Sequence, residues 1–201
     1  MREATLLAPM PAGSPHGPKA HDGTLTTTRP DEMWGIHLTS ALPRRQGNAS
    51  IFIVVDHGTT ECLGIHATRR ATRFEALAPL RQGVCEIVGA YDEGAARGVT
   101  VGHDHGSQLV ADHFQRELAF LGMTSSPAFV REPEGNGCAE RFIRTLTEQL
   151  LWLHCFDTID DLHAALQEFR RRYTSSWLLQ RHGYLSPAAA RPALAGLPAA
   201  A

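Results

Sequence analysis

The sequence lacks the features that would assign it to several common classes. Its four cysteines are scattered, and none forms the CxxC spacing of a zinc ribbon. Scattered thiols are typical of reduced cysteines in a cytoplasmic protein. The apolar run Leu6-Leu7-Ala8 is too short for a signal-peptide core, and no stretch approaches the roughly 20 apolar residues of a membrane span. We therefore expect a cytoplasmic location and no membrane partner.

The chain also carries little net charge. Its 19 Lys and Arg residues nearly balance 21 Asp and Glu residues, which gives a net charge of −2 and a pI near 6.6. Contacts with nucleic acid would therefore come from local groups of arginines. The length of 201 residues suits one domain with flexible ends. We expect a linker-like segment at 1–30, a folded domain at 31–185 and an Ala/Pro-rich tail at 186–201 that frays.

Hydrophobic patterning predicts alternating strands and helices. Apolar runs predict five strands, at 33–38, 51–55, 62–68, 98–103 and 123–125. Apolar residues at helical spacing predict four helices, at 73–92, at 108–121, from about 137 and at 158–173. Pro79 is the point at which the first of them can be interrupted. The first three strands are close enough in sequence to form an antiparallel meander, and strand–helix units follow. This order predicts an α/β fold with a mixed five-stranded sheet flanked by helices.

Two acidic residues stand in distinctive surroundings. Asp104 directly follows the predicted strand at 98–103, so it would lie at the carboxyl end of that strand, where open α/β sheets place their sites. Glu140 comes 36 positions later, just after a glycine-containing loop turns into a helix at Gly137. Two carboxylates that converge at one sheet edge suit Mg²⁺ or Mn²⁺, which prefer oxygen ligands.

These motifs resemble the integrase core of insertion-sequence transposases and, more distantly, of retroviral integrases. The segments that carry the resemblance, besides those of Asp104 and Glu140, are Glu32-Met33-Trp34-Gly35, Ile51 to Asp56 and Arg141-Phe142-Ile143-Arg144-Thr145-Leu146. The resemblance covers nearly the whole chain, from about residue 18 to about residue 190. It implies a ribonuclease-H-like fold for the predicted mixed sheet.

The resemblance also implies a chemistry. In this family two metal ions clamp a phosphodiester during DNA cleavage and strand transfer, so Mg²⁺ or Mn²⁺ is the expected cofactor and DNA the expected substrate. Asp104 and Glu140 match the second and third catalytic carboxylates and are the expected metal ligands. The expected DNA contacts are Gln108, Arg131, Asn136, Arg141 and Arg144.

Plainer roles exist for the same residues. Asp104 suits a turn, and Glu140 suits the first turn of a helix, where the helix dipole favours an acid. Arg141 and Arg144 suit a solvated helix face, or Arg144 an ion pair with Glu140. His103 and His105, with His37, would be candidates for a zinc site, although the alternation of a strand points the first two away from Asp104.

One position departs from the family pattern. His37 stands where the first catalytic aspartate belongs, shortly after Trp34-Gly35. An imidazole can bind Mn²⁺ but cannot bridge two ions as a carboxylate does. Loss of one such electrostatic group typically costs about 10²–10³ in rate, so we expect impaired catalysis. Asp56 would lie about 13 Å from His37 along the paired strand, which is too far to replace the missing carboxylate.

Three functional hypotheses follow. The first is a transposase-like core for DNA integration with impaired catalysis, and the second is a non-catalytic remnant that binds DNA or poisons the assembly of an intact transposase. The third is a nuclease of the same fold that acts on RNA–DNA hybrids. Relatives carry an upstream helix-turn-helix region that residues 1–30 are too few to hold. The expected partners are therefore DNA and either further copies of the chain or an intact transposase with a helix-turn-helix subunit.

Overall fold

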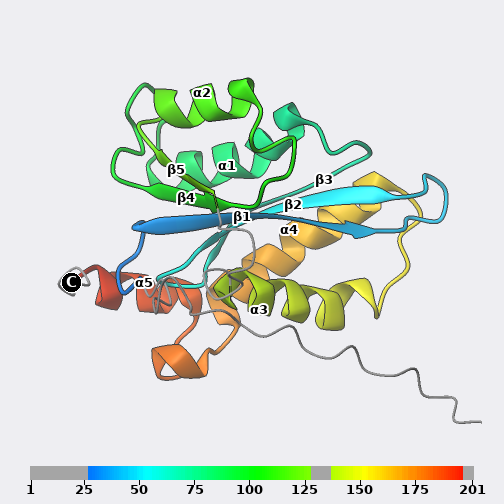
Figure 1. The fold of residues 1–201 in the computed structure, drawn as a ribbon. Helices are drawn as coiled ribbons and strands as arrows, with labels where there is room; N and C mark the ends of the chain where they lie inside the picture. Colours follow the sequence, from blue (N-terminus) through cyan, green and yellow to red (C-terminus); the bar gives the residue numbers. More distant parts are fainter. Residues whose placement is uncertain (1–26, 128–136, 197–201) are drawn as a thin grey trace, which may run out of the picture.

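A mixed five-stranded sheet forms the centre of the molecule (Figure 1). The computed structural model describes residues 27–127 and 137–196. In spatial order the strands are β3 (Cys62–Thr68), β2 (Ala49–Asp56), β1 (Met33–Ala41), β4 (Thr100–His103) and β5 (Thr124–Pro127). The first three pair antiparallel, whereas β4 lies parallel to β1, and β5 parallel to β4. The predicted α/β fold with a mixed five-stranded sheet is confirmed.

Helices cover both faces of this sheet. In Figure 1, α1 (Arg73–Ile87) and α2 (Asp112–Phe120) lie above it, and α3 (Gly137–Leu146) and α4 (Ile159–Ser176) lie below it. A π-helical turn, η2 (Thr147–Leu151), continues α3. A short 3-10 helix, η3 (Gln180–His182), and α5 (Pro187–Ala195) complete the described chain. Among the described residues, no helix is both long and apolar enough to cross a membrane.

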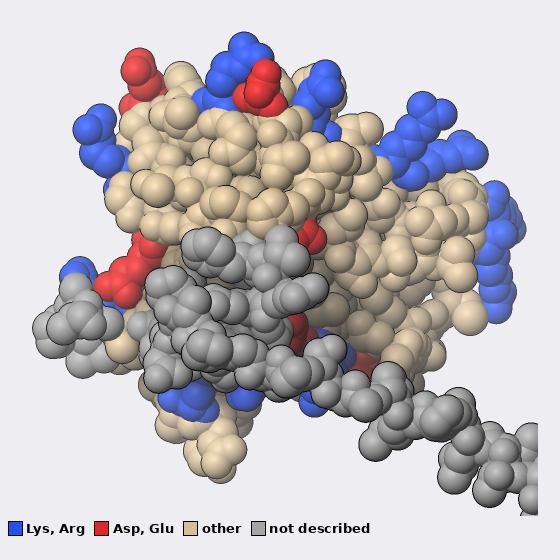
Figure 2. All heavy atoms as spheres, in the orientation of Figure 1, with Lys and Arg blue, Asp and Glu red and all other residues tan. Residues whose placement is uncertain are grey.

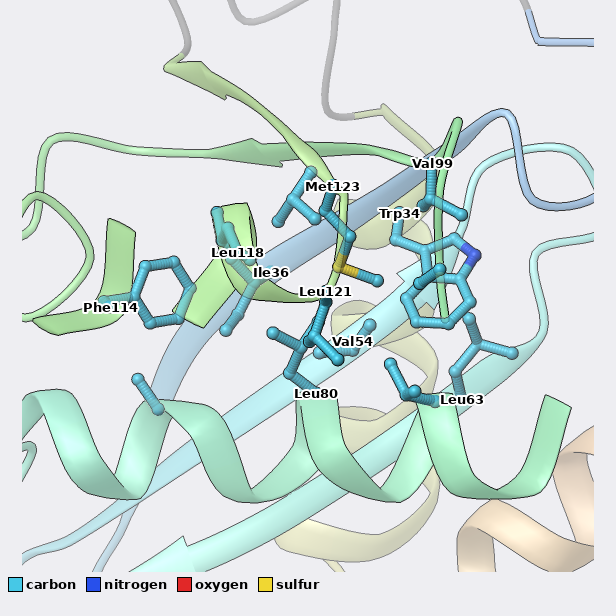
Figure 3. Close-up of a cluster of buried hydrophobic side chains, with 14 of the residues drawn as sticks. Trp34, Ile36, Val54, Leu63, Leu80, Val99, Phe114, Leu118, Leu121 and Met123 are labelled. Carbon is cyan, nitrogen blue, oxygen red and sulfur yellow. The ribbon is translucent and has the colours of Figure 1, made fainter. Parts of the chain in front are cut away.

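Alternation along the strands divides the core into two layers. Trp34, Ile36 and Val54 pack toward α1 and α2 against Leu80 and Leu118 (Figure 3). The intervening residues of β2, which include Ile53 and Val55, pack toward α3 and α4. All of β2 is buried, as expected for a central strand with helices on both faces. Each large apolar side chain buried in this way contributes about 1.5–3 kcal/mol.

Several predicted boundaries differ from the structure. Helix α1 runs through Pro79 without interruption and docks so closely on β3 that a Cβ on Gly64 would lie 1.9 Å from the Pro79 carbonyl oxygen. Helix α2 begins at Asp112, after a turn at 107–111, and not at Gln108. Helical spacing predicts Leu153 on the apolar stripe of α3, but this residue is 65% exposed, because the π-helical turn changes the helical phase before it.

The carboxyl-terminal segment is ordered by an ion-pair cluster. Composition predicts fraying from Ser186, yet α5 forms over Pro187–Ala195, where Ser186 caps it and Ala190 is buried. Arg191 pairs at 2.6 Å with both Asp31 and Glu61. Its third nitrogen, Nη2, lies 3.9 Å from the buried carboxylate of Asp56. This cluster ties α5 to the start of β1 and to the turn after β2, an arrangement that composition alone could not indicate.

Replacement of Arg191 should destabilise the fold in a pH-dependent way. Burial raises the pKa of Asp56 to about 6, so the folded state binds a proton that the unfolded state has released, and stability falls as pH rises from about 4 to about 6. Arg191 opposes this rise in pKa. Arg191→Ala should therefore cost about 3–5 kcal/mol near pH 7.5, as the loss of one member of a buried pair does, and clearly less at pH 5.

Urea unfolding at both pH values measures this effect. Arg171→Ala is the matched control, because Arg171 forms an exposed pair with Glu168 whose loss should cost at most about 0.5 kcal/mol. Equal losses of stability for the two variants, or a loss at Arg191 that does not change with pH, would contradict a charge cluster at this position.

Candidate functional site

The register between β1 and β4 brings two of the predicted site residues together. Ile36 of β1 pairs with His103 of β4 in the parallel ladder. His37 is the next residue of β1, and Asp104 directly follows the last residue of β4. The negative charge of Asp104 acts on the His37 ring and raises its pKa, against two larger effects of opposite sign. His37 and Asp104 are thus neighbours at the edge where β4 ends.

Asp104 combines a turn with an exposed carboxylate. Its Oδ1 accepts a hydrogen bond of 2.8 Å from the backbone N–H of Gly106, which fixes the loop after β4. The side chain is otherwise exposed. The turn role proposed for Asp104 is therefore real, and it leaves the second carboxylate oxygen available to a ligand.

A second histidine, which the sequence did not single out, meets His37. A Cβ built on Gly35 would lie 2.5 Å from Nε2 of His57 and 3.0 Å from Nε2 of His37. The two nitrogens are therefore no farther apart than the sum of these distances. Both Nε2 atoms are buried, and neither has a hydrogen-bond partner. Glycine at position 35 leaves the space into which both rings point.

The two rings are neutral near pH 7. Burial lowers the pKa of His37 to about 4, helped by His57 and opposed by Asp104. Burial also lowers the pKa of His57 to about 4, with a further contribution from the positive charge of Arg181. Each neutral imidazole has one nitrogen with a free lone pair, and which nitrogen this is depends on the tautomer.

Helix α3 begins next to His57 and carries Glu140 in its first turn. Ala139 and Phe142 are buried and fix the helix on the sheet, so Glu140 is directed outward and is exposed. The start of the helix is further held by Cys138, whose thiol lies 3.6 Å from the His57 carbonyl oxygen and accepts a 2.8 Å hydrogen bond from Arg181. No motif or spacing in the sequence indicated that His57 and Arg181 contact Cys138.

The predicted DNA-contact residues are only partly described. Arg141 and Arg144 are exposed on α3, and no ion pair joins either of them, or Glu140, to another described residue. The ion pair between Glu140 and Arg144, considered above as an alternative, therefore does not form in this described part of the chain. Gln108 lies half-buried in the loop after Asp104, where it contacts Ser107. Arg131 and Asn136 lie outside the described residues.

The other histidines and Asp56 are committed elsewhere. His103 packs on Phe114 of α2 and contacts Ser125 Oγ at 2.8 Å, on the opposite side of the sheet from His37. This rules out a zinc site of His37, His103 and His105. Asp56 accepts two hydrogen bonds from Thr59 and pairs across the ladder with Trp34, whereas His37 pairs with Ile53. Asp56 therefore lies three positions along β2, about 10 Å, from the residue that pairs with His37, and its side chain points to the opposite face of the sheet.

No preassembled metal cluster is present in the described parts of the chain. Within residues 27–127 and 137–196, no group of three or more His, Cys, Asp or Glu side chains is placed to hold a metal ion. Asp104 and Glu140 are two exposed carboxylates on separate elements, and the third expected member is an imidazole. This set of ligands does not fit a site for two oxygen-preferring ions, because it lacks the bridging carboxylate.

Comparisons with known proteins agree with the fold. The family model described as integrase core domain matches residues 121–187. A chain of the simian T-cell lymphotropic virus intasome, solved in complex with the PP2A regulatory subunit B56 gamma, aligns with a TM-score of 0.63 and 16% identity over 85% of this chain. The chain spans 56% of the length of that protein. No curated protein sequence matches the chain.

Isolated catalytic cores align over nearly their whole length. The HTLV-2 integrase catalytic core, solved with magnesium, has a TM-score of 0.60 at 13% identity, with 81% of this chain and 97% of that one covered. The BIV integrase catalytic core aligns with a TM-score of 0.55 at 16% identity, and the alignment covers 79% of this chain and 91% of that one. These similarities confirm the ribonuclease-H-like fold. Residues 121–187 thus match an integrase core domain model, and the described chain shares the fold of retroviral integrase catalytic cores.

Proposed function

We propose that the chain is a transposase-like core for DNA integration, derived from an insertion sequence, in which His37 impairs metal-dependent strand cleavage and transfer. The observation that supports this is the placement of His37 beside Asp104 at the end of β4, with Glu140 on the helix that starts next to them. In this proposal His37 occupies the position of the family's first aspartate, so the charge and the bridging oxygens of that aspartate are lost.

The chemistry of the retained residues explains the impairment. Magnesium demands oxygen ligands, and two adjacent divalent ions need carboxylates to offset their mutual repulsion. Asp104 and Glu140 supply two negative charges, and a neutral His37 supplies none. Asp56 cannot restore the third charge, because its carboxylate is buried on the other face and hydrogen-bonded to Thr59.

DNA binding would depend on local arginines. Figure 2 shows Lys and Arg side chains dispersed around the outline of one face and not gathered into a broad basic surface. Arg141 and Arg144 are exposed three residues apart on α3, beside Glu140. We assign these two arginines to phosphate binding near the site, and we retain Gln108, Arg131 and Asn136 as further DNA-binding residues.

A second candidate function is a non-catalytic one. The loss of the first aspartate favours a remnant that binds DNA or joins the assembly of an intact transposase and poisons it. The structural neighbours include an intasome and dimeric and trimeric forms of a catalytic core, and self-association of this chain is part of the proposal. An intact transposase with a helix-turn-helix subunit would then supply the specific recognition of DNA.

Nicking of supercoiled plasmid with Mn²⁺ tests the role of His37. The natural protein should nick no faster than its Glu140→Gln variant. His37→Asp should raise the rate by about 10²–10³, because it restores the missing carboxylate, and Glu140→Gln in that background should abolish the gain. Nicking by the natural protein that depends on Glu140 would show that His37 is a working ligand. Cleavage of RNA–DNA hybrids alone would favour a nuclease.

The salt dependence of DNA binding tests the assignment of Arg141 and Arg144. The double variant Arg141→Ala/Arg144→Ala should bind duplex DNA more weakly, and the slope of log K against log salt should fall by about 0.9 for each phosphate that the variant no longer neutralises. Arg116→Ala is the control, since Arg116 is an exposed arginine on α2 across the sheet. Equal effects of the control and the double variant would contradict a DNA surface on α3.

A further inference from the structure

The pair formed by His37 and His57 is unusual for a buried pair of imidazoles. Most buried polar atoms have a hydrogen-bond partner, yet here two Nε2 atoms in one place have none. His57 is held firmly, because its residue is 2% exposed and its backbone N–H donates to the Met33 carbonyl at 2.9 Å. His37 is fixed in the middle of β1. Strand β1 and the turn after β2 therefore direct two nitrogens at the same space above Gly35.

A second histidine pair in the same protein provides a contrast. His66 and His163 lie edge to face with their ring centroids 5.4 Å apart. His66 Nε2 contacts Glu75 at 2.6 Å, and His163 Nδ1 accepts from the Ala67 N–H. This pair has partners within the fold and therefore needs no ligand. The His37–His57 pair lacks such partners, although it is the more closely enclosed of the two.

The chemistry of the missing partner follows from the atoms that face it. Two imidazole nitrogens suit a divalent ion that accepts nitrogen, such as Zn²⁺, Co²⁺ or Ni²⁺, at about 2.0–2.1 Å for zinc. Magnesium is a poor match, because it prefers oxygen ligands. The neighbouring carboxylate of Asp104 supplies negative charge close to His37. A single water molecule between the two nitrogens is the competing occupant.

We propose that His37 and His57 together bind one nitrogen-preferring divalent ion, with Asp104 beside it and water in the remaining coordination positions. One consequence of this inference rests on the proposed function. If the site descends from a magnesium site, His37 changes its metal preference from magnesium toward zinc-like ions. The binding itself requires neither DNA nor catalysis.

Metal titration of the full chain tests the proposal. The titration uses Co²⁺ followed by visible absorption, and Zn²⁺ followed by calorimetry, at pH 7.5. A Cys85→Ser/Cys155→Ser background removes the two exposed thiols, which could bind these ions by themselves. We expect one ion per chain, and Mg²⁺ should not compete. His37→Gln and His57→Ala should each weaken binding by on the order of tenfold or more, because each removes one of two nitrogen ligands.

The control is His163→Ala, which disrupts the other histidine pair and should leave the affinity unchanged. Circular dichroism of each metal-free variant establishes folding, and His37→Gln, at the half-buried position, keeps the test valid if His57→Ala does not fold. An absence of binding in the natural chain, or equal affinity in the His37→Gln variant, would overturn the proposal and leave water as the occupant.

The outcomes also separate this proposal from the proposed function. If the natural chain does not bind Zn²⁺ but His37→Asp nicks plasmid, the metal proposal fails and the transposase-like function stands. If Zn²⁺ binds through His37 and His57 but no variant nicks or binds DNA, the metal site stands and the proposed function fails.

Discussion

The placement of β1 between β2 and β4 is the constraint on which the site depends. Successive side chains of a strand point to opposite faces, so Ile36 enters the core under α1 and α2 and His37 faces the other layer. The parallel register of Ile36 with His103 then sets His37 beside Asp104. A shift of one residue would place His37 in the apolar core under α1 and α2 and remove Ile36 from it, which explains why this register is strongly specified.

The sequence predicted the sheet well because its strands are short apolar runs with clear ends. The bounds of β3 were predicted as the structure has them, and the strand predicted at 51–55 lies within β2. The site was predicted in part: Asp104 follows β4, and Glu140 lies in the first turn of α3. Whether these two act as metal ligands stays a prediction.

The features that the sequence did not reveal depend on contacts between distant segments. Helix α5 is rich in Ala and Pro, and it is fixed because Arg191 meets acids that lie about 130 and 160 residues earlier in the chain. His57 directly follows β2, and no motif or spacing in the sequence singled it out. Its role depends on Gly35, whose missing Cβ leaves room for two rings. Neither arrangement has a local pattern, since each is created by tertiary packing.

The effect of His37 is best understood through its charge. Burial lowers its pKa to about 4, so a histidine at the position that the proposed function assigns to an aspartate removes one negative charge near pH 7 without adding a positive one. Asp104 and Glu140 remain exposed and keep the surroundings attractive to a cation. Under the proposed function, this substitution changes the ligand atom from a bridging oxygen to a nitrogen that binds one ion. Because His57 lies close by, a histidine at position 37 would change which ion the site prefers more than whether the site attracts a cation.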